Sequence, residues 1–281
     1  MKETTCTYAA AAPSKSVRAW GCEFGGFSEY APTSIHRLEP PAATAVIVLC
    51  CGEPLTLQPA LSRGSTSRLY AFSAGLQVQA QRVTHQGIND CVEIRMPPLA
   101  SYALFGAVMA ESSREPVSLL DIAPRPISIL LDQLRDTSSW EHRLAAVNRF
   151  LQSGFAESKC RIPPELTWAW ETLERYHGQV SIGALARAIG WSERHLIDRF
   201  STYFGVRPKA TARRLRFSHA FNLVSAHPAG DLSMIAAQAG FSDQSHMTRE
   251  FQTFAGLTPG VLRTARFDNL PGIPAAVLPN R

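Results

Sequence analysis

The last third of the chain contains a segment that occurs twice, and this repeat constrains the fold more than any other feature. The first copy reads Leu185-Ala186-x-x-x-Gly190-Trp191-Ser192, and the second reads Ile235-Ala236-x-x-x-Gly240-Phe241-Ser242. One extra residue then enters the second copy. Beyond it, His195-Leu196 matches His246-Met247, and Phe200-x-x-x-Phe204-Gly205-x-x-Pro208 matches Phe251-x-x-x-Ala255-Gly256-x-x-Pro259. Agreement at this many positions indicates one supersecondary unit that is present twice.

Each copy has the residues of two short helices joined by a tight turn. A small alanine, Ala186 or Ala236, lets the first helix pack closely against the second, and the following glycine permits a left-handed turn. Ser192 and Ser242 are then the predicted N-caps of the second helices. Apolar residues on one face leave the opposite, polar face of this helix free, as in helix-turn-helix units that enter the major groove.

A single long helix is predicted between the two copies, from Pro208 to Ala226. Its 19 residues span about 28 Å at ~1.5 Å per residue. That length is close to the ~34 Å between equivalent major-groove faces one turn apart on B-DNA. One rigid helix of this length would therefore present both units to the same side of a duplex.

The positive charge of the chain is confined to the same region. Residues 1–160 contain 14 Lys/Arg and 14 Asp/Glu, whereas residues 161–281 contain 14 Lys/Arg and 9 Asp/Glu, which accounts for the whole net charge of +5. Such asymmetry indicates an anionic partner for the C-terminal part alone. Taken by itself, the charge also fits an ordinary domain that binds no nucleic acid.

Residues 165–265 resemble the C-terminal domain of the AraC/XylS family of transcription regulators. The resemblance rests on Ala236-x-x-x-Gly240-Phe241-Ser242-Asp243-Gln244-Ser245-His246-Met247-x-Arg249-x-Phe251, followed by Gly256-x-x-Pro259. It implies a sequence-specific transcription regulator whose two helix-turn-helix units read successive major grooves of operator or promoter DNA. It further implies RNA polymerase as a partner, and an N-terminal domain, often a cupin-like barrel, that binds a small effector.

The same resemblance implies the residues that contact DNA. In the first unit they are Ser192, Arg194, Ile197 and Asp198, and in the second they are Gln244, Ser245, Thr248 and Arg249. The chemistry suits the second unit best, because glutamine pairs with the adenine edge and arginine with guanine. Asp198 departs from the family pattern, and we expect it to pair with Arg194 one turn earlier.

Further basic residues follow the first unit. Arg199 is either a phosphate contact or only a surface residue. For each member of the run that follows, phosphate contact and a structural role are equally consistent with the sequence; the run comprises Arg207, Lys209, Arg213, Arg214 and Arg216. Arg214 is the member for which the resemblance implies a place in the interior of the domain.

The N-terminal part is predicted to be β-rich, which makes the chain an α+β protein with a sensing barrel or sandwich, trailing helices and an all-α C-terminal domain. We expect a regulatory domain over 1–155, a linker over 156–164, a DNA-binding domain over 165–266 and a loose tail over 267–281. Strands are predicted at Val17–Phe24, Thr44–Cys50, Arg68–Phe72, Leu76–Val83 and Gly87–Ile94. Helices are predicted at Leu99–Phe105, Pro126–Arg135 and Trp140–Ser153. Trp20, Phe24 and Phe27 are predicted to be core residues, with a ligand-binding cluster of aromatic side chains as the alternative.

No enzymatic motif, cofactor site or metal site is predicted. The sequence has no GxSxG, GxxxxGK or HExxH motif, and His36 and His85 are isolated. The longest apolar run, residues 42–51, is shorter than the ~20 residues that cross a bilayer, and no signal peptide is evident. We therefore expect a cytoplasmic protein without a membrane partner.

Two alternatives to a ligand-controlled regulator involve the N-terminal cysteines. A repair-type protein would accept an alkyl group on Cys91 or Cys22, although neither has an adjacent histidine that would activate a thiol. A redox regulator would use Cys50 and Cys51, but the same two residues also fit the end of a buried strand. A homodimer is a further possibility, because Leu144, Val147 and Leu151 recur at helical spacing, but burial against the N-terminal domain explains that pattern equally well.

Overall fold

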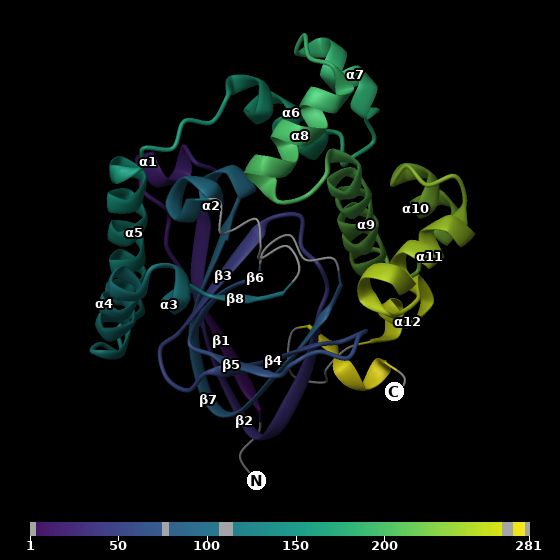
Figure 1. Ribbon diagram of the computed structural model, residues 1–281. Helices are drawn as coiled ribbons and strands as arrows, with labels where there is room; N and C mark the ends of the chain where they lie inside the picture. Colours follow the sequence, from purple (N-terminus) through teal and green to yellow (C-terminus); the bar gives the residue numbers. More distant parts are fainter. Residues whose placement is uncertain (1–3, 75–78, 107–114, 266–271, 279–281) are drawn as a thin grey trace.

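The computed structural model describes residues 4–74, 79–106, 115–265 and 272–278. An antiparallel sheet forms the N-terminal half, and helices form the C-terminal half (Figure 1). This arrangement confirms the predicted fold class. Within the described residues, no helix is both long enough and apolar enough to cross a membrane.

The sheet is organised by two long, paired strands. Strand β2 (Glu23–Glu39) runs antiparallel to β7 (Gln81–Met96), with Phe24 opposite Ile94 near one end and Glu39 opposite Gln81 at the other. The first part of β7 also pairs with β4, and its last part pairs with β3. The sheet therefore curls around an interior that several strands share. The remaining strands are β1 (Thr5–Ala10), β3 (Ala45–Cys50), β4 (Leu55–Pro59), β5 (Ser67–Leu69), β6 (Ala71–Ala74) and β8 (Val117–Ser118).

Helices cover one side of this sheet (Figure 1). Leu144, Val147 and Leu151, the stripe considered above for dimerisation, are all fully buried in the core that this helical layer forms with the sheet. The stripe thus packs within its own domain. The helices of this part are α1 (Lys15–Arg18), α2 (Pro98–Phe105), α3 (Leu119–Ile122), α4 (Pro124–Arg135) and α5 (Trp140–Glu157).

The predicted strand at Val17–Phe24 is wrong. Its first part belongs to the short helix α1, and a turn at Gly21, where φ is +69°, precedes the start of β2. The spacing of the apolar residues also fits an alternating strand. In the structure, Val17 and Trp20 lie one helical turn apart and pack in the same core as α5. Trp20 stacks on Phe155 of that helix at 4.7 Å. The prediction at Leu76–Val83 lies partly outside the described residues.

The C-terminal helices follow the predicted order. Helix α9, which joins the two repeated units, spans the 19 residues from Pro208 to Ala226. The others are α6 (Pro164–Arg175), α7 (Ile182–Ala188), α8 (Glu193–Phe204), α10 (Leu232–Gln238), α11 (Gln244–Ala255) and α12 (Pro259–Thr264).

The end of the chain returns to the N-terminal sheet. Over residues 272–278 it is not the loose tail that was expected, because β9 (Ile273–Pro274) pairs with β2 at Leu38 and Arg37. Ile273 and Leu278 are buried beside residues of α11 and α12 in one apolar cluster. Prolines at 271, 274 and 279 suggested a disordered segment, but proline is compatible with a short strand at a sheet edge.

Candidate nucleic-acid interface and internal cavity

The first repeated unit has the geometry that its residues predict. Ser192 caps α8, and its hydroxyl accepts the backbone N–H of His195 at 3.2 Å. Gly190 makes the turn with a φ of +73°. Leu185 and Leu196 are buried between the helices, so the opposite face of α8 is left at the surface.

The second unit repeats this geometry, with one difference. Its turn glycine, Gly240, has a φ of +77°, and a Cβ there would lie 2.6 Å from the side chain of Gln179. The predicted N-cap Ser242 is wrong: Asp243 caps α11, and its carboxylate accepts the N–H of His246. The extra residue in this copy explains the shift, because it moves the cap by one position and keeps His246 three residues beyond it.

The residues expected to read DNA lie on the free faces of α8 and α11. In the first unit Ser192, Arg194 and Asp198 are exposed and Ile197 is half-buried. In the second unit three of the expected residues are exposed and Thr248 is half-buried; the exposed residues are Gln244, Ser245 and Arg249. Each helix therefore presents a polar surface to solvent.

The predicted contact between Asp198 and Arg194 is present. The carboxylate lies 4.0 Å from Nε of Arg194, and the two side chains are 69% and 93% exposed. An ion pair this exposed contributes little stability. Its effect is to place a negative charge beside the one arginine expected to read bases in the first unit.

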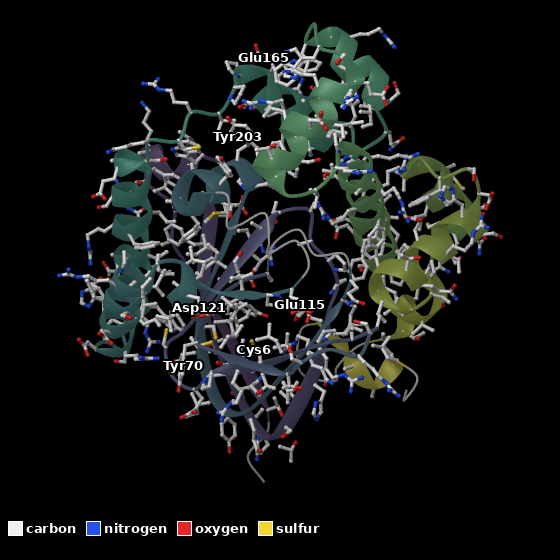
Figure 2. The ribbon with its side chains drawn as sticks, in the orientation of Figure 1. Cys6, Tyr70, Glu115, Asp121, Glu165 and Tyr203 are labelled. Carbon is white, nitrogen blue, oxygen red and sulfur yellow. The ribbon has the colours of Figure 1, made fainter. Side chains whose placement is uncertain are left out.

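Arg199 points away from this surface. Its guanidinium donates to the hydroxyl of Tyr203 at 3.4 Å and lies over the Tyr203 ring. Tyr203 in turn packs against Tyr102 of α2, with ring centroids 4.9 Å apart. Figure 2 shows Tyr203 on the side of α8 that faces the N-terminal domain. Arg199 thus supports a contact between the two halves of the molecule.

The basic run divides into exposed and structural members. Arg207 and Lys209 are exposed at the start of α9, where they remain available to phosphates. Arg213 makes a two-pronged ion pair with Glu250 of α11, at 2.7 and 3.1 Å. Arg214 is buried, as expected, and burial lowers its pKa to about 9. Arg216 is half-buried.

A cavity of about 710 Å³ lies between the inner face of the sheet and the C-terminal helices. The sheet side is largely apolar and includes Phe27, Val48, Leu57 and Phe72. The helical side consists of Glu174 of α6 and of Ser218, Phe221 and Asn222 of α9. The helix that joins the two repeated units therefore forms part of the wall. Phe27, predicted to be a core residue, lines this cavity.

Charged and polar groups gather where β2 and β7 meet this cavity. Arg37 holds the buried Glu29 with two hydrogen bonds, of 2.8 and 3.2 Å, and Arg95 holds Glu93 at 2.5 Å. Glu39 is 52% exposed and lies 4.0 Å from Arg37. Desolvation outweighs the attraction of Arg37, and Glu93 adds repulsion, so the pKa of Glu39 is raised to about 7.

Gln81 is the least expected residue of the cavity wall. Its side chain is 2% exposed, and neither its amide nitrogen nor its amide oxygen has a hydrogen-bond partner among the described residues. It lies directly opposite Glu39 in the β2–β7 ladder. The sequence did not predict a site that contains Gln81 and the α9 residues. No sequence pattern shows that β7 and α9 line one cavity.

The cysteines are placed differently from either cysteine hypothesis. Cys50 faces Cys91 across β3 and β7 with the sulfurs 3.6 Å apart, while Cys51, its neighbour in sequence, points to the other side of the strand. Burial raises the pKa of Cys22 to about 12, and the hydrogen bond with Cys50 and burial raise that of Cys91 well above its usual value. His36 and His85 belong to no potential metal site, since the described residues contain no cluster of three or more His, Cys, Asp or Glu side chains that could hold a metal ion.

A family model described as a helix-turn-helix domain matches residues 185–265. Among curated proteins, an uncharacterized HTH-type transcriptional regulator of Staphylococcus aureus strain MSSA476 is 32% identical over 91 residues, as is its counterpart in strain N315. This alignment covers 32% of the chain and only 12% of those relatives.

Two solved structures are similar at a lower level. ToxT from Vibrio cholerae shares 10% identity with a TM-score of 0.46, over 86% of this chain and 98% of that chain. A transcriptional regulator with an AraC-type DNA-binding domain from Chromobacterium violaceum shares 26% identity with a TM-score of 0.33, over 36% of this chain and 90% of that chain.

The matched segment begins in α7 and ends after α12, so it contains both repeated units and the helix that joins them. It includes the two glycine turns, the capped second helices and the sequence signature of the second copy. The C-terminal part of this chain is an AraC-type helix-turn-helix domain.

Proposed function

We propose that the chain is a cytoplasmic, sequence-specific transcription regulator that reads operator DNA with α8 and α11. The observation that carries this proposal is the pair of free polar faces on helices joined by α9. Arg194 on α8, and Gln244 and Arg249 on α11, supply the groups that recognise guanine and adenine edges. Arg207 and Lys209 supply charge for phosphate contacts.

The test is a binding titration with an operator selected from random duplexes by the purified full-length chain. Arg249→Ala should weaken binding to that duplex by about 1–3 kcal/mol and relax the preference at one base pair. Arg125→Ala is the matched control, because Arg125 is exposed on α4 in the N-terminal domain. Unchanged affinity of Arg249→Ala would remove that residue from the interface, and failure to select any duplex would refute the function.

We further propose that a small effector binds in the cavity and controls DNA binding. The support is the mixed apolar and polar wall, of a size typical of small-molecule sites. Because α9 closes the cavity, an effector would contact the helix that spaces the two reading units. RNA polymerase and a second copy of the chain complete the proposed set of partners, and we propose no enzymatic activity for the chain itself.

The cysteine-based functions receive less support. An alkyl-accepting or oxidant-sensing thiol must reach the thiolate state and be accessible. Cys22, Cys51 and Cys91 are buried with raised pKa values. The hydrogen bond from Cys91 lowers the pKa of Cys50, but Cys50 is fully buried. These features favour a structural role for the sulfurs.

A further inference from the structure

The ligand class of the cavity can be read from the charges on its wall. The lining includes four carboxylates, Glu23, Glu39, Glu93 and Glu174, but only two guanidinium groups, those of Arg37 and Arg95. Arg95 is bound to Glu93, and Arg37 holds Glu29, a carboxylate outside the lining, as well as lying near Glu39. The wall therefore carries excess negative charge, which disfavours an anionic ligand and favours a cation.

Gln81 is a second and independent sign of a ligand. A buried amide without hydrogen bonds costs stability, and such groups in native proteins generally have a partner. The Gln81 side chain lines the cavity and has none among the described residues. Residues directly opposite in an antiparallel pair project from the same face of the sheet, so Gln81 and Glu39 lie side by side.

The two side chains together define one recognition element. Glu39 offers a carboxylate, and Gln81 offers a carbonyl oxygen beside it, so both accept hydrogen bonds from one donor group. A few residues away the wall is apolar and aromatic, with Phe27, Leu57 and Phe72 from three strands. A ligand that satisfies both regions has a positively charged, donor-rich head and an apolar body.

We propose that the cavity binds an amphipathic organic cation, with its ammonium or guanidinium head between Glu39 and Gln81 and its apolar body against Phe27, Leu57 and Phe72. This inference rests on the proposed role of the cavity as the effector site. Phe221 and Asn222 of α9 lie on the opposite wall. A ligand of this class bridges the sheet and α9, so its occupancy would couple to the position of the reading units.

The test compares three probes that share one apolar chain: decylammonium, decanoate and decan-1-ol, each below its aggregation concentration. Binding is measured by calorimetry on the full-length protein. Decylammonium should bind at least about tenfold more tightly than decanoate, the effect of one charge-assisted hydrogen bond. Glu39→Gln should weaken the binding of decylammonium about tenfold. Glu53→Gln is the matched control, since Glu53 is 77% exposed and lies outside this cavity.

The possible outcomes test the ligand class and the effector cavity separately. Equal or tighter binding of decanoate, or unchanged affinity of Glu39→Gln for decylammonium, overturns the cationic ligand while leaving an effector cavity in place. If none of the three probes binds, the cavity fails as an apolar effector site as well. The operator titration is independent of all three results, so the DNA-binding proposal stands or falls separately.

Discussion

At the scale of single residues, Glu39 makes the cavity sensitive to pH. Its pKa is raised to about 7, so the carboxyl is mostly protonated near pH 6 and mostly ionised near pH 8. The charged groups around it are Arg37 and Glu29 on β2 and Glu93 and Arg95 on β7, and Glu174 faces the cavity from α6. A cation should bind more tightly to the ionised form than to the protonated form, because only the ionised form carries a negative charge.

Affinity for decylammonium should therefore rise between about pH 6 and pH 8, over which the probe itself stays protonated. The expected gain is several-fold, and calorimetry at each pH measures it. Glu39→Gln should flatten the profile because the titrating group is gone. A rise that persists in this variant would assign the titration to another group.

The cysteines give a second residue-scale prediction. Cys6 and Cys160 are partly exposed, whereas Cys22, Cys50, Cys51 and Cys91 are buried. Iodoacetamide should label the first two in the native protein within minutes and all six only after unfolding, as mass spectrometry would show. Rapid native labelling of Cys91 would instead revive a reactive role for that thiol.

At the scale of elements, the caps of the two reading helices can be tested against each other. Asp243 accepts the N–H of His246, whereas Ser242 donates to the Asp243 carboxylate and leaves the backbone of α11 uncapped by its own side chain. Asp243→Ala should lower the Tm by a few degrees, and Ser242→Ala should lower it less. In the first unit Ser192→Ala should resemble Asp243→Ala. The reverse order in the second unit would contradict the assigned cap.

The elements also show what the sequence could and could not predict. The helices of the repeat were predictable because local signals define them: turn glycines, caps and apolar spacing all lie within a few residues of one another. The start of β2 was not, because the residues before it form a helical turn whose apolar side chains pack on α5, a contact far away in sequence. The Arg213–Glu250 pair and the side chains around the cavity likewise depend on contacts between distant segments. Apolar periodicity predicted a free polar face on each reading helix, and six of the eight expected reading residues are exposed there, whereas Arg199 contacts Tyr203.

At the scale of the whole molecule, the second unit is fastened to the N-terminal domain. Leu38 and Ala80 of that domain belong to the same apolar cluster as Phe251 and Phe254. The backbone N–H of Ala80 donates to the carbonyl of Phe254 at 2.8 Å. Strand β9 adds a further connection to β2. The N-terminal domain therefore contacts both reading helices, α8 through the Tyr102–Tyr203 pair and α11 through this cluster.

Shortening Ile273 tests this connection. Ile273→Ala should destabilise the protein by about 2 kcal/mol, because it removes buried methyl groups from the shared cluster. Hydrogen exchange should accelerate in β2 near Leu38 and in α11. Ala276→Ser is the control, since Ala276 is exposed and its change should stay within about 0.5 kcal/mol. Equal effects of the two changes would mean that residues 272–278 do not hold α11 and the N-terminal domain together.

The shared cluster also determines how the molecule can be divided for study. A fragment cut between α5 and α6 and ended after α12 would contain both repeated units, yet it would lack Leu38, Ala80, Ile273 and Leu278. Phe254 and Leu257 would then face water as an apolar patch, which promotes association. The linker predicted over 156–164 therefore does not separate two independent apolar cores, because the second unit shares one core with the N-terminal domain.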